Sequence, residues 1–180
     1  IKRREDPRFI TGKGNDTDDL KLPGMTYAAF VRSPHAHAKI RKIDTAKALA
    51  YPGVVAVFTG KDMAGVNSLP CGWLLPDLKV PPHMPLATDA ARYVGDPVAI
   101  VIAESQTAAL DAAELVAVDW DVKPSVTRTD KAAIKGAPGM HEVAPDNVAF
   151  RWQIGDPAAT DAAFQSAAVT VKKRIVNQRL

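Results

Sequence analysis

Apolar residues along the first two thirds of the chain recur with the spacings of short strands and short helices. Runs of β-branched and aromatic residues, and one stretch of alternating apolar and charged residues, predict strands over residues 25–32, 38–44, 54–59, 98–103 and 116–121. Ser105 is expected to cap a helix to about residue 115, with small apolar residues along one face, and Thr45 is expected to cap a shorter helix over 46–51. Strands interleaved with helices in this way predict an α+β domain, in which 98–121 is the best-defined unit.

Residues 64–88 interrupt this regular pattern. The stretch has few regular periods and contains five prolines: Pro70, Pro76, Pro81, Pro82 and Pro85. A long loop inside a compact domain is usually functional or lies at an interface. Regular structure is expected again at 92–97, where the sequence predicts a strand fragment followed by a turn.

The two ends of the chain differ from its middle. The first residues are polar and rich in turn formers, which predicts an extended arm. After Pro124 a polar stretch has the composition of a linker, and it is followed by a predicted strand over 148–154, a helix from Asp156 to about Ser166 and a strand over 168–176. These last elements are too few to close a core, so we expect the chain to end inside a second domain. The expected divisions are 1–19 (arm), 20–126 (first domain), 127–147 (linker) and 148–180 (start of the second domain).

Composition narrows the possible functions. The 180 residues suit one domain, or one domain with a piece of another. The 23 basic and 20 acidic residues are interspersed and give a formal net charge of +3, so no nucleic-acid surface is indicated. The single cysteine, Cys71, excludes an internal disulfide, and no cysteine and histidine set for zinc occurs. The longest apolar runs are too short to cross a bilayer and no signal peptide is present, so we expect a cytoplasmic protein.

His35-Ala36-His37 is the arrangement most suggestive of metal binding. On a strand, residues two apart lie on one face, so both imidazoles could reach one metal ion. The sequence places no third ligand, and Ser33-Pro34 indicates a turn here. Histidines hydrogen-bonded to the backbone or to neighbouring groups are the favoured interpretation, and a metal site is the alternative.

The acidic stretch near the N-terminus has part of a calcium-loop spacing, at Asp16, Asp18 and Asp19. The sixth and twelfth positions of such a loop hold glycine and glutamate, whereas here they are Lys21 and Tyr27. A solvated turn is therefore expected.

Two glycine-containing stretches resemble phosphate-binding loops only superficially. Between Gly53 and Gly60-Lys61-Asp62 the spacing is wrong, and Asp62 replaces the hydroxyl residue that binds magnesium. Gly12-Lys13-Gly14 follows no strand, so it is not a dinucleotide fingerprint. The first is interpreted as a strand-to-turn connection and the second as part of the arm.

Nucleophilic and acid–base candidates are also weak. Cys71 needs a base whose position the sequence does not show, with only His83 and His141 downstream, and an unreactive loop thiol is favoured. Three acidic residues are expected to form the solvated flank of the helix after Ser105: Glu104, Asp111 and Glu114. The residues alone therefore indicate no active site.

A series of short motifs, taken in order, carries more information than any one of them. The two most specific are Ala29-Phe30-Val31-Arg32-Ser33-Pro34-His35-Ala36-His37-Ala38 and Pro52-Gly53-Val54-Val55-Ala56-Val57. The others are Lys2-Arg3-Arg4-Glu5-Asp6-Pro7-Arg8-Phe9, Thr11-Gly12-Lys13-Gly14, Asp18-Asp19, Leu22-Pro23-Gly24-Met25, Arg92-Tyr93-Val94-Gly95-Asp96-Pro97-Val98-Ala99, Gly155-Asp156 and Asn177-Gln178-Arg179. In order and spacing they resemble the large subunits of molybdenum hydroxylases, the relatives of xanthine dehydrogenase, aldehyde oxidoreductase and aerobic carbon monoxide dehydrogenase. One departure is Asn15-Asp16-Thr17, where the family usually has an aromatic residue.

This resemblance implies an α/β hammerhead domain over about 20–126, a mixed sheet with packed helices, followed from about residue 148 by the first elements of a molybdopterin-binding domain. The family's cofactor loops and its base-acting glutamate lie beyond the equivalent of Leu180, so no catalytic, cofactor-binding or metal-binding residue is expected in this chain. The 32–38 stretch is then structural or a subunit contact.

The resemblance also implies cofactors and partners for the complete enzyme. It would hold a molybdenum–molybdopterin cofactor of the cytosine dinucleotide type in the full-length subunit. An iron–sulfur small subunit with 2Fe-2S centres, an FAD-binding medium subunit and a second large subunit would be its partners, because this chain starts where separate large subunits start. The substrate stays open between carbon monoxide, aldehydes and N-heterocycles. The alternative is a free-standing, non-enzymatic binding or assembly module.

Overall fold

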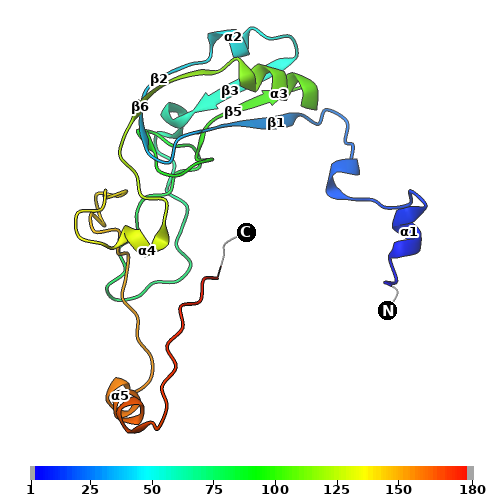
Figure 1. Ribbon diagram of the computed structural model, residues 1–180. Helices are drawn as coiled ribbons and strands as arrows, with labels where there is room; N and C mark the ends of the chain where they lie inside the picture. Colours follow the sequence, from blue (N-terminus) through cyan, green and yellow to red (C-terminus); the bar gives the residue numbers. More distant parts are fainter. Residues whose placement is uncertain (1–2, 178–180) are drawn as a thin grey trace.

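A computed structural model describes residues 3–177 of the chain (Figure 1). Residues 1–2 and 178–180 lie outside the described residues, and with them the first residue of the motif that begins at Lys2 and the last two residues of the motif that begins at Asn177. In chain order the elements are α1 (Asp6–Ile10), the 3₁₀ helix η1 (Thr17–Asp19), β1 (Tyr27–Arg32), β2 (Ala38–Asp44), α2 (Ala46–Leu49), β3 (Val54–Thr59), the 3₁₀ helix η2 (Gly60–Met63), β4 (Ala90–Ala91), β5 (Pro97–Ala103), α3 (Gln106–Glu114), β6 (Ala117–Val122), α4 (Thr129–Ala132) and α5 (Pro157–Ser166).

The strands of the described part form two three-stranded sheets. In the β5 sheet, β5 lies between β1 and β3, and in the β2 sheet, β2 lies between β4 and β6. All these strand pairs are antiparallel, whereas a mixed sheet was expected. The unit of β5, α3 and β6 therefore joins the two sheets, instead of connecting neighbouring strands of one sheet.

The core lies between α3 and the β5 sheet. Ala109 and Ala112 of α3 are 1% and 0% exposed, and they belong to the clusters that contain Val101 and Ala103 of β5. Small side chains at these contacts let the helix approach the sheet closely. The predicted cap of α3 is confirmed, since Ser105 Oγ accepts a hydrogen bond from the Ala108 amide at 3.1 Å.

Two predictions of local structure need correction. The Thr45 side chain makes no cap bond, and Asp44 Oδ1 instead accepts from the Ala46 amide at 3.2 Å at the start of α2, which ends at Leu49. The strand fragment expected over 92–97 is a turn, and β4 lies just before it. The turn forms because the Asp96 carboxylate accepts a hydrogen bond from the Arg92 amide at 2.9 Å.

The N-terminal arm and the C-terminal segment have no buried residue in any of their helices. The helix after Asp156 is confirmed, with Asp156 Oδ1 accepting from the Ala159 amide at 3.0 Å. The strands predicted over 148–154 and 168–176 are wrong for this chain: their described residues are not in strands. A strand needs a partner strand to satisfy its backbone, and no other described segment pairs with them.

The molecule has the outline of an arch in Figure 1. The two sheets form its top with α2 and α3 on the outside, while the N-terminal arm descends on one side and α4 and α5 on the other. Among residues 3–177, no helix has the length and apolar character needed to span a membrane.

Gly60 fixes how closely the long loop passes over the end of β3. A Cβ at this position would lie 2.3 Å from the Ala87 carbonyl oxygen and 2.7 Å from the Thr88 Cα. We expect Gly60→Ala to lower the free energy of unfolding by about 1–3 kcal/mol, because backbone atoms must shift to admit the methyl group. Urea unfolding of the purified chain measures this, with Gly72→Ala as the matched control, since a Cβ there meets nothing within 4 Å. Equal stability of the two variants would contradict the prediction.

Candidate functional site

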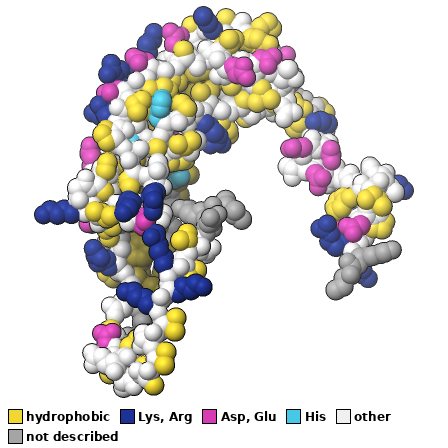
Figure 2. Space-filling view, in the orientation of Figure 1, with side chains coloured by type: hydrophobic (Ala, Val, Ile, Leu, Met, Phe, Trp, Pro, Cys, Tyr) yellow, Lys and Arg dark blue, Asp and Glu magenta, His cyan; other side chains and the backbone are white. Residues whose placement is uncertain are grey.

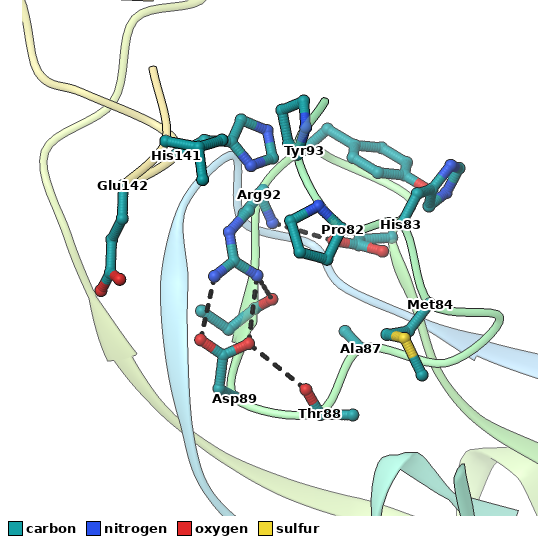
Figure 3. A pocket seen from close by; sticks show the side chains of 14 residues that line it. Pro82, His83, Met84, Ala87, Thr88, Asp89, Arg92, Tyr93, His141 and Glu142 are labelled. Atoms are coloured by element: carbon teal, nitrogen blue, oxygen red, sulfur yellow. Dashed lines mark hydrogen bonds and ion pairs between the residues drawn. The ribbon is translucent and has the colours of Figure 1, made fainter. Parts of the chain in front are cut away.

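The most structured polar region of the chain is the turn that follows β4. The Arg92 guanidinium binds the Asp89 carboxylate through two hydrogen bonds, Nη1 to Oδ1 at 3.1 Å and Nη2 to Oδ2 at 2.9 Å, and Nη1 also reaches the Ala90 carbonyl at 3.2 Å (Figure 3). The Arg92 guanidinium lowers the pKa of Asp89, against the opposing effect of partial burial, which is the larger single contribution. Arg92 is therefore occupied by its own turn.

Asp96 ties this turn to the end of β1. Asp96 is 6% exposed. Its carboxylate accepts the hydrogen bond from the Arg92 amide, and its backbone carbonyl accepts a hydrogen bond from the Ser33 amide at 2.9 Å. The Gly95 amide donates to the Ser33 carbonyl at 2.8 Å, and Arg32 Nη1 donates to the Gly95 carbonyl at 2.9 Å. Gly95 has a φ of 92°, which favours glycine. Two of the family-like motifs, 29–38 and 92–99, thus meet at one corner.

A cavity of about 530 Å³ opens beside this corner. Its wall comes from the end of the long loop, from the turn after β4 and from residues 141–143, and Figure 3 shows His83, Arg92, Tyr93 and His141 around it. The rings of His83 and Tyr93 meet edge to face, with 6.4 Å between their centroids. Burial and the nearby Asp96 carboxylate raise the pKa of Tyr93. The phenol is therefore protonated at neutral pH.

His141 brings a neutral imidazole to the cavity. Burial lowers the pKa of His141, and the positive charge of Arg92 lowers it further, while the Asp96 carboxylate acts in the opposite direction. A group buried in its neutral form loses solvation when it is charged. The lining thus offers aromatic rings, proline rings and satisfied polar groups, which suit the binding of a side chain or a small molecule better than nucleophilic chemistry.

Asn147 holds the loop that carries His141. Its Oδ1 accepts a hydrogen bond from the Met140 amide, and its Nδ2 donates to the carbonyls of Ala132 and Pro138, all three at 2.9 Å. Asn147 is also the non-glycine residue with a positive φ, 57°, in the described part of the chain. One amide side chain therefore closes residues 132–147 into a compact loop.

The long loop predicted to be functional or at an interface contacts the segment that follows the 127–147 stretch. The Lys79 amide donates to the Ala149 carbonyl at 2.9 Å, and the Arg151 amide donates to Asp77 Oδ2 at 3.2 Å. The rings of Trp73 and Trp152 meet edge to face at 6.4 Å. The loop thus guides the chain as it leaves the sheets.

The two histidines of the 35–37 motif do not converge. The His35 ring lies edge to face with Trp120 at 5.7 Å, and His37 Nδ1 lies 3.1 Å from the Pro124 carbonyl oxygen. The favoured interpretation of hydrogen-bonded histidines therefore fits His37, whereas the His35 ring makes an aromatic contact instead. Within residues 3–177, no cluster of three or more potential metal-binding side chains of histidine, cysteine, aspartate or glutamate occurs.

The remaining sequence candidates have local structural roles. The Asp19 carboxylate accepts a hydrogen bond from the Asp16 amide at 2.9 Å, which closes the expected turn. The Asp62 carboxylate accepts from the Thr59 amide at 2.7 Å, and this bond lowers the pKa of Asp62. The thiol of Cys71 is exposed and lies 3.2 Å from the Trp73 carbonyl oxygen.

The predicted solvated flank of α3 is confirmed. Glu104, Asp111 and Glu114 are all exposed, and the Asp111 carboxylate also accepts a hydrogen bond from the Tyr51 hydroxyl at 2.9 Å, which raises the pKa of Tyr51. Three features of this region were not predicted from the sequence: the corner of Arg92 and Asp96, the hydrogen bonds of Asn147, and the position of His141 at the cavity. The one local signal for the loop that ends at Asn147 was the asparagine itself, because asparagine tolerates the left-handed backbone conformation that a turn often needs.

Comparison with known proteins places this geometry in a family. Residues 11–124 match the family described as aldehyde oxidase and xanthine dehydrogenase, a/b hammerhead domain, and the chain therefore belongs to this family. This confirms both the resemblance and the hammerhead fold class.

Individual relatives agree with this assignment. The carbon monoxide dehydrogenase large chain of Afipia carboxidovorans is 41% identical over 191 aligned positions, which cover 99% of this chain and 23% of that protein. The structure of reconstituted CO dehydrogenase from Oligotropha carboxidovorans has a TM-score of 0.79 at 40% identity and covers 94% of this chain and 22% of that chain. For aldehyde oxidoreductase from Desulfovibrio gigas the TM-score is 0.77 at 33% identity, with 94% and 19% covered. The chain thus spans less than a quarter of the length of these relatives.

Protonation of His141 should destabilise the fold. Because its folded-state pKa lies below the unfolded value of about 6.5, the unfolded state binds more protons, and stability present above this pH is lost as the pH falls through it. We expect the urea midpoint to fall between pH 7 and 5, above the range in which carboxylates titrate, and to fall less in His141→Gln. Lys135→Gln, on the same loop, is the control and should retain the wild-type slope. Parallel curves for wild type and His141→Gln would exclude this role.

Asn147 should control the order of its loop. In Asn147→Ala, three hydrogen bonds worth about 1 kcal/mol each are lost, and alanine tolerates the left-handed region less well than asparagine does. Amide hydrogen exchange of residues 132–147 should accelerate by about a hundredfold, since about 3 kcal/mol is lost and each 1.4 kcal/mol is a factor of ten. Asn147→Gly, which loses the same hydrogen bonds but adopts the left-handed region freely, should show a smaller acceleration. The exposed Asn67→Ala is the control, and unchanged exchange in Asn147→Ala would contradict the assignment.

Proposed function

We propose that this chain is the N-terminal part of the large subunit of a molybdenum hydroxylase, in which it acts as a scaffold and a subunit interface. The observation that carries the proposal is the 41% identity to a carbon monoxide dehydrogenase large chain across 99% of this chain. The nicotine 6-hydroxylase large subunit of Paenarthrobacter nicotinovorans, 38% identical over 93% of the chain and 20% of its own length, supports the same position in a larger protein. The divisions 1–19, 20–126, 127–147 and 148–180 are part of this proposal.

The residues of this chain do not fit a molybdenum site. The only closely spaced histidine pair of the described segment is divided, with His35 against Trp120 and His37 beside the Pro124 carbonyl oxygen. The carboxylates of the corner are engaged as well, since Asp89 binds Arg92 and Asp96 binds the Arg92 amide. We therefore assign no catalytic, cofactor-binding or metal-binding residue to this chain and derive no reaction step from it.

The complete enzyme would have its chemistry and partners elsewhere. We propose a molybdenum–molybdopterin cofactor of the cytosine dinucleotide type, at which substrate is oxidised with oxygen derived from water. Two electrons would then pass to 2Fe-2S centres on a small subunit and to FAD on a medium subunit. A large-subunit homodimer and a cytoplasmic location complete the proposal. One solved relative is named as a copper- and molybdenum-containing CO dehydrogenase, which supports the choice of molybdenum.

In this proposal the chain supplies structural support. The hydrogen bonds that join Ser33 to Gly95 and Asp96 hold the end of β1 against the turn after β4. The Asn147 loop and the long loop fix the path of the chain away from the sheets. Such a framework would orient a following cofactor domain and offer surfaces to other subunits.

Molybdenum content tests the proposal directly. The complete coding sequence that contains this segment, expressed with its neighbouring subunits, should yield a complex with about one molybdenum per large subunit by elemental analysis. The purified 180-residue chain, prepared from the same host, is the control and should contain none. A full-length protein free of molybdenum in a host that loads other molybdenum enzymes would overturn the proposal and favour the non-enzymatic binding module.

A further inference from the structure

The two faces of the β5 sheet differ in what covers them. On one face Ala29 of β1 and Val101 of β5 pack into the core beneath α3. The opposite face, named here the open face, consists of the alternate residues of each strand. They form two cross-strand rows, Phe30–Ile100–Phe58 and Ala28–Ile102–Ala56.

All six residues of the open face are apolar. Phe30 is 47% exposed and Phe58 is 42% exposed, and the helices that contact this sheet, α2 and α3, lie on the outside of the arch (Figure 1). An antiparallel sheet with one face in water normally carries polar residues on that face. A row of aromatic and aliphatic side chains there marks a surface that another part of a protein covers.

The strand β5 itself has the composition of a strand buried on both faces. Each of its seven residues, Pro97–Ala103, is apolar, without the alternation of a half-buried strand. Val98, which precedes the row of Ile100 by two residues on the same face, is 0% exposed. The long loop crosses at this point, where the Ala87 amide donates to the Pro97 carbonyl at 2.8 Å. The loop covers the first position of the face and leaves the next two open.

We propose that the open face is covered by a later part of the same large-subunit chain, an inference that rests on the proposed function. In the relatives the matched region is less than a quarter of the polypeptide, so most of the chain is available to fold over it. None of the six residues of the open face is charged, and the Arg32 guanidinium lies at its edge, with its Cζ 5.2 Å from the centre of the Phe30 ring. Interfaces that never separate have this core-like, uncharged composition, whereas interfaces between domains or subunits that part are more polar.

Apolar side chains on two other parts of the chain also favour a cover from the same polypeptide. The N-terminal arm and the C-terminal segment expose Phe9, Ile154 and Phe164, and Figure 2 shows apolar side chains on both. Both parts extend from the same side of the sheets as the open face, so one body inside the arch would contact all three (Figure 1). A covalently linked domain also binds at a high effective concentration, which a separate subunit lacks.

Photo-crosslinking in the full-length subunit, purified with its partners, tests the occupant. Phe58 is replaced by p-benzoylphenylalanine, a photoreactive residue of similar shape, and irradiated protein is digested and mapped by mass spectrometry. The expected product joins the peptide of position 58 to a peptide of the same chain beyond residue 180, with the mass of the subunit unchanged. A link to another subunit, a link to a second copy of the large subunit, or no link would each overturn the inference.

Two controls make the outcome decisive. The same replacement at Leu110, 55% exposed on α3, should not link to the peptide found from position 58. If the position-58 variant does not assemble, replacement of Phe30 in the same row tests the same face. Molybdenum measured in the same preparation separates the two claims: a complex with molybdenum but a link to another subunit overturns only this inference, and a complex without molybdenum overturns the proposed function.

Discussion

The close packing of α3 against β5 is the constraint on which the rest of the structure depends. Ala109 and Ala112 have almost no exposed surface, and their neighbours on the sheet are equally small or β-branched. The Ala108 Cβ also lies 3.7 Å from where a Cβ of Gly53 would be, so the turn before β3 is packed against the same helix. Because protein cores have few voids, a larger side chain on this helix face would move the helix off the sheet.

This packing also sets the relation between the two sheets. After α3, Val116 is 8% exposed and belongs to the same cluster as Val101, so the chain enters β6 directly from the core. There β6 pairs with β2, whose Ile43 packs against that cluster. A second tie lies at the other end, where the Ser33 backbone binds Gly95 and Asp96. The two sheets are therefore joined at both ends, through the core at Val116 and through the backbone hydrogen bonds of Ser33. The joined sheets carry both the cavity beside the corner and the open face.

Much of this architecture could be predicted from the sequence because it depends on local signals. The five longer strands of the two sheets, the cap of α3 at Ser105 and the helix after Asp156 each have a period or a capping residue of their own, whereas the short β4 has neither. The strands expected over 148–154 and 168–176 failed for a physical reason: alternation supplies a face, but a strand also needs a partner backbone. The corner could not be predicted, because Arg92, Asp96 and Ser33 meet through a contact between distant segments. The family motifs identified the segments but not that they meet.

The surfaces of this support differ in what they require of a partner. At the cavity, Arg92 and Asp96 are already satisfied by hydrogen bonds within the corner, so a group can enter without leaving a buried charge unpaired. The open face presents no polar group to satisfy, and its stabilisation comes only from removal of apolar area from water, which is roughly proportional to the area covered. A small ligand or a single side chain can therefore fill the cavity, whereas only an extended apolar surface stabilises the open face. The open face of this hammerhead domain therefore suits a large and permanent cover, whereas the cavity at its corner suits a small occupant.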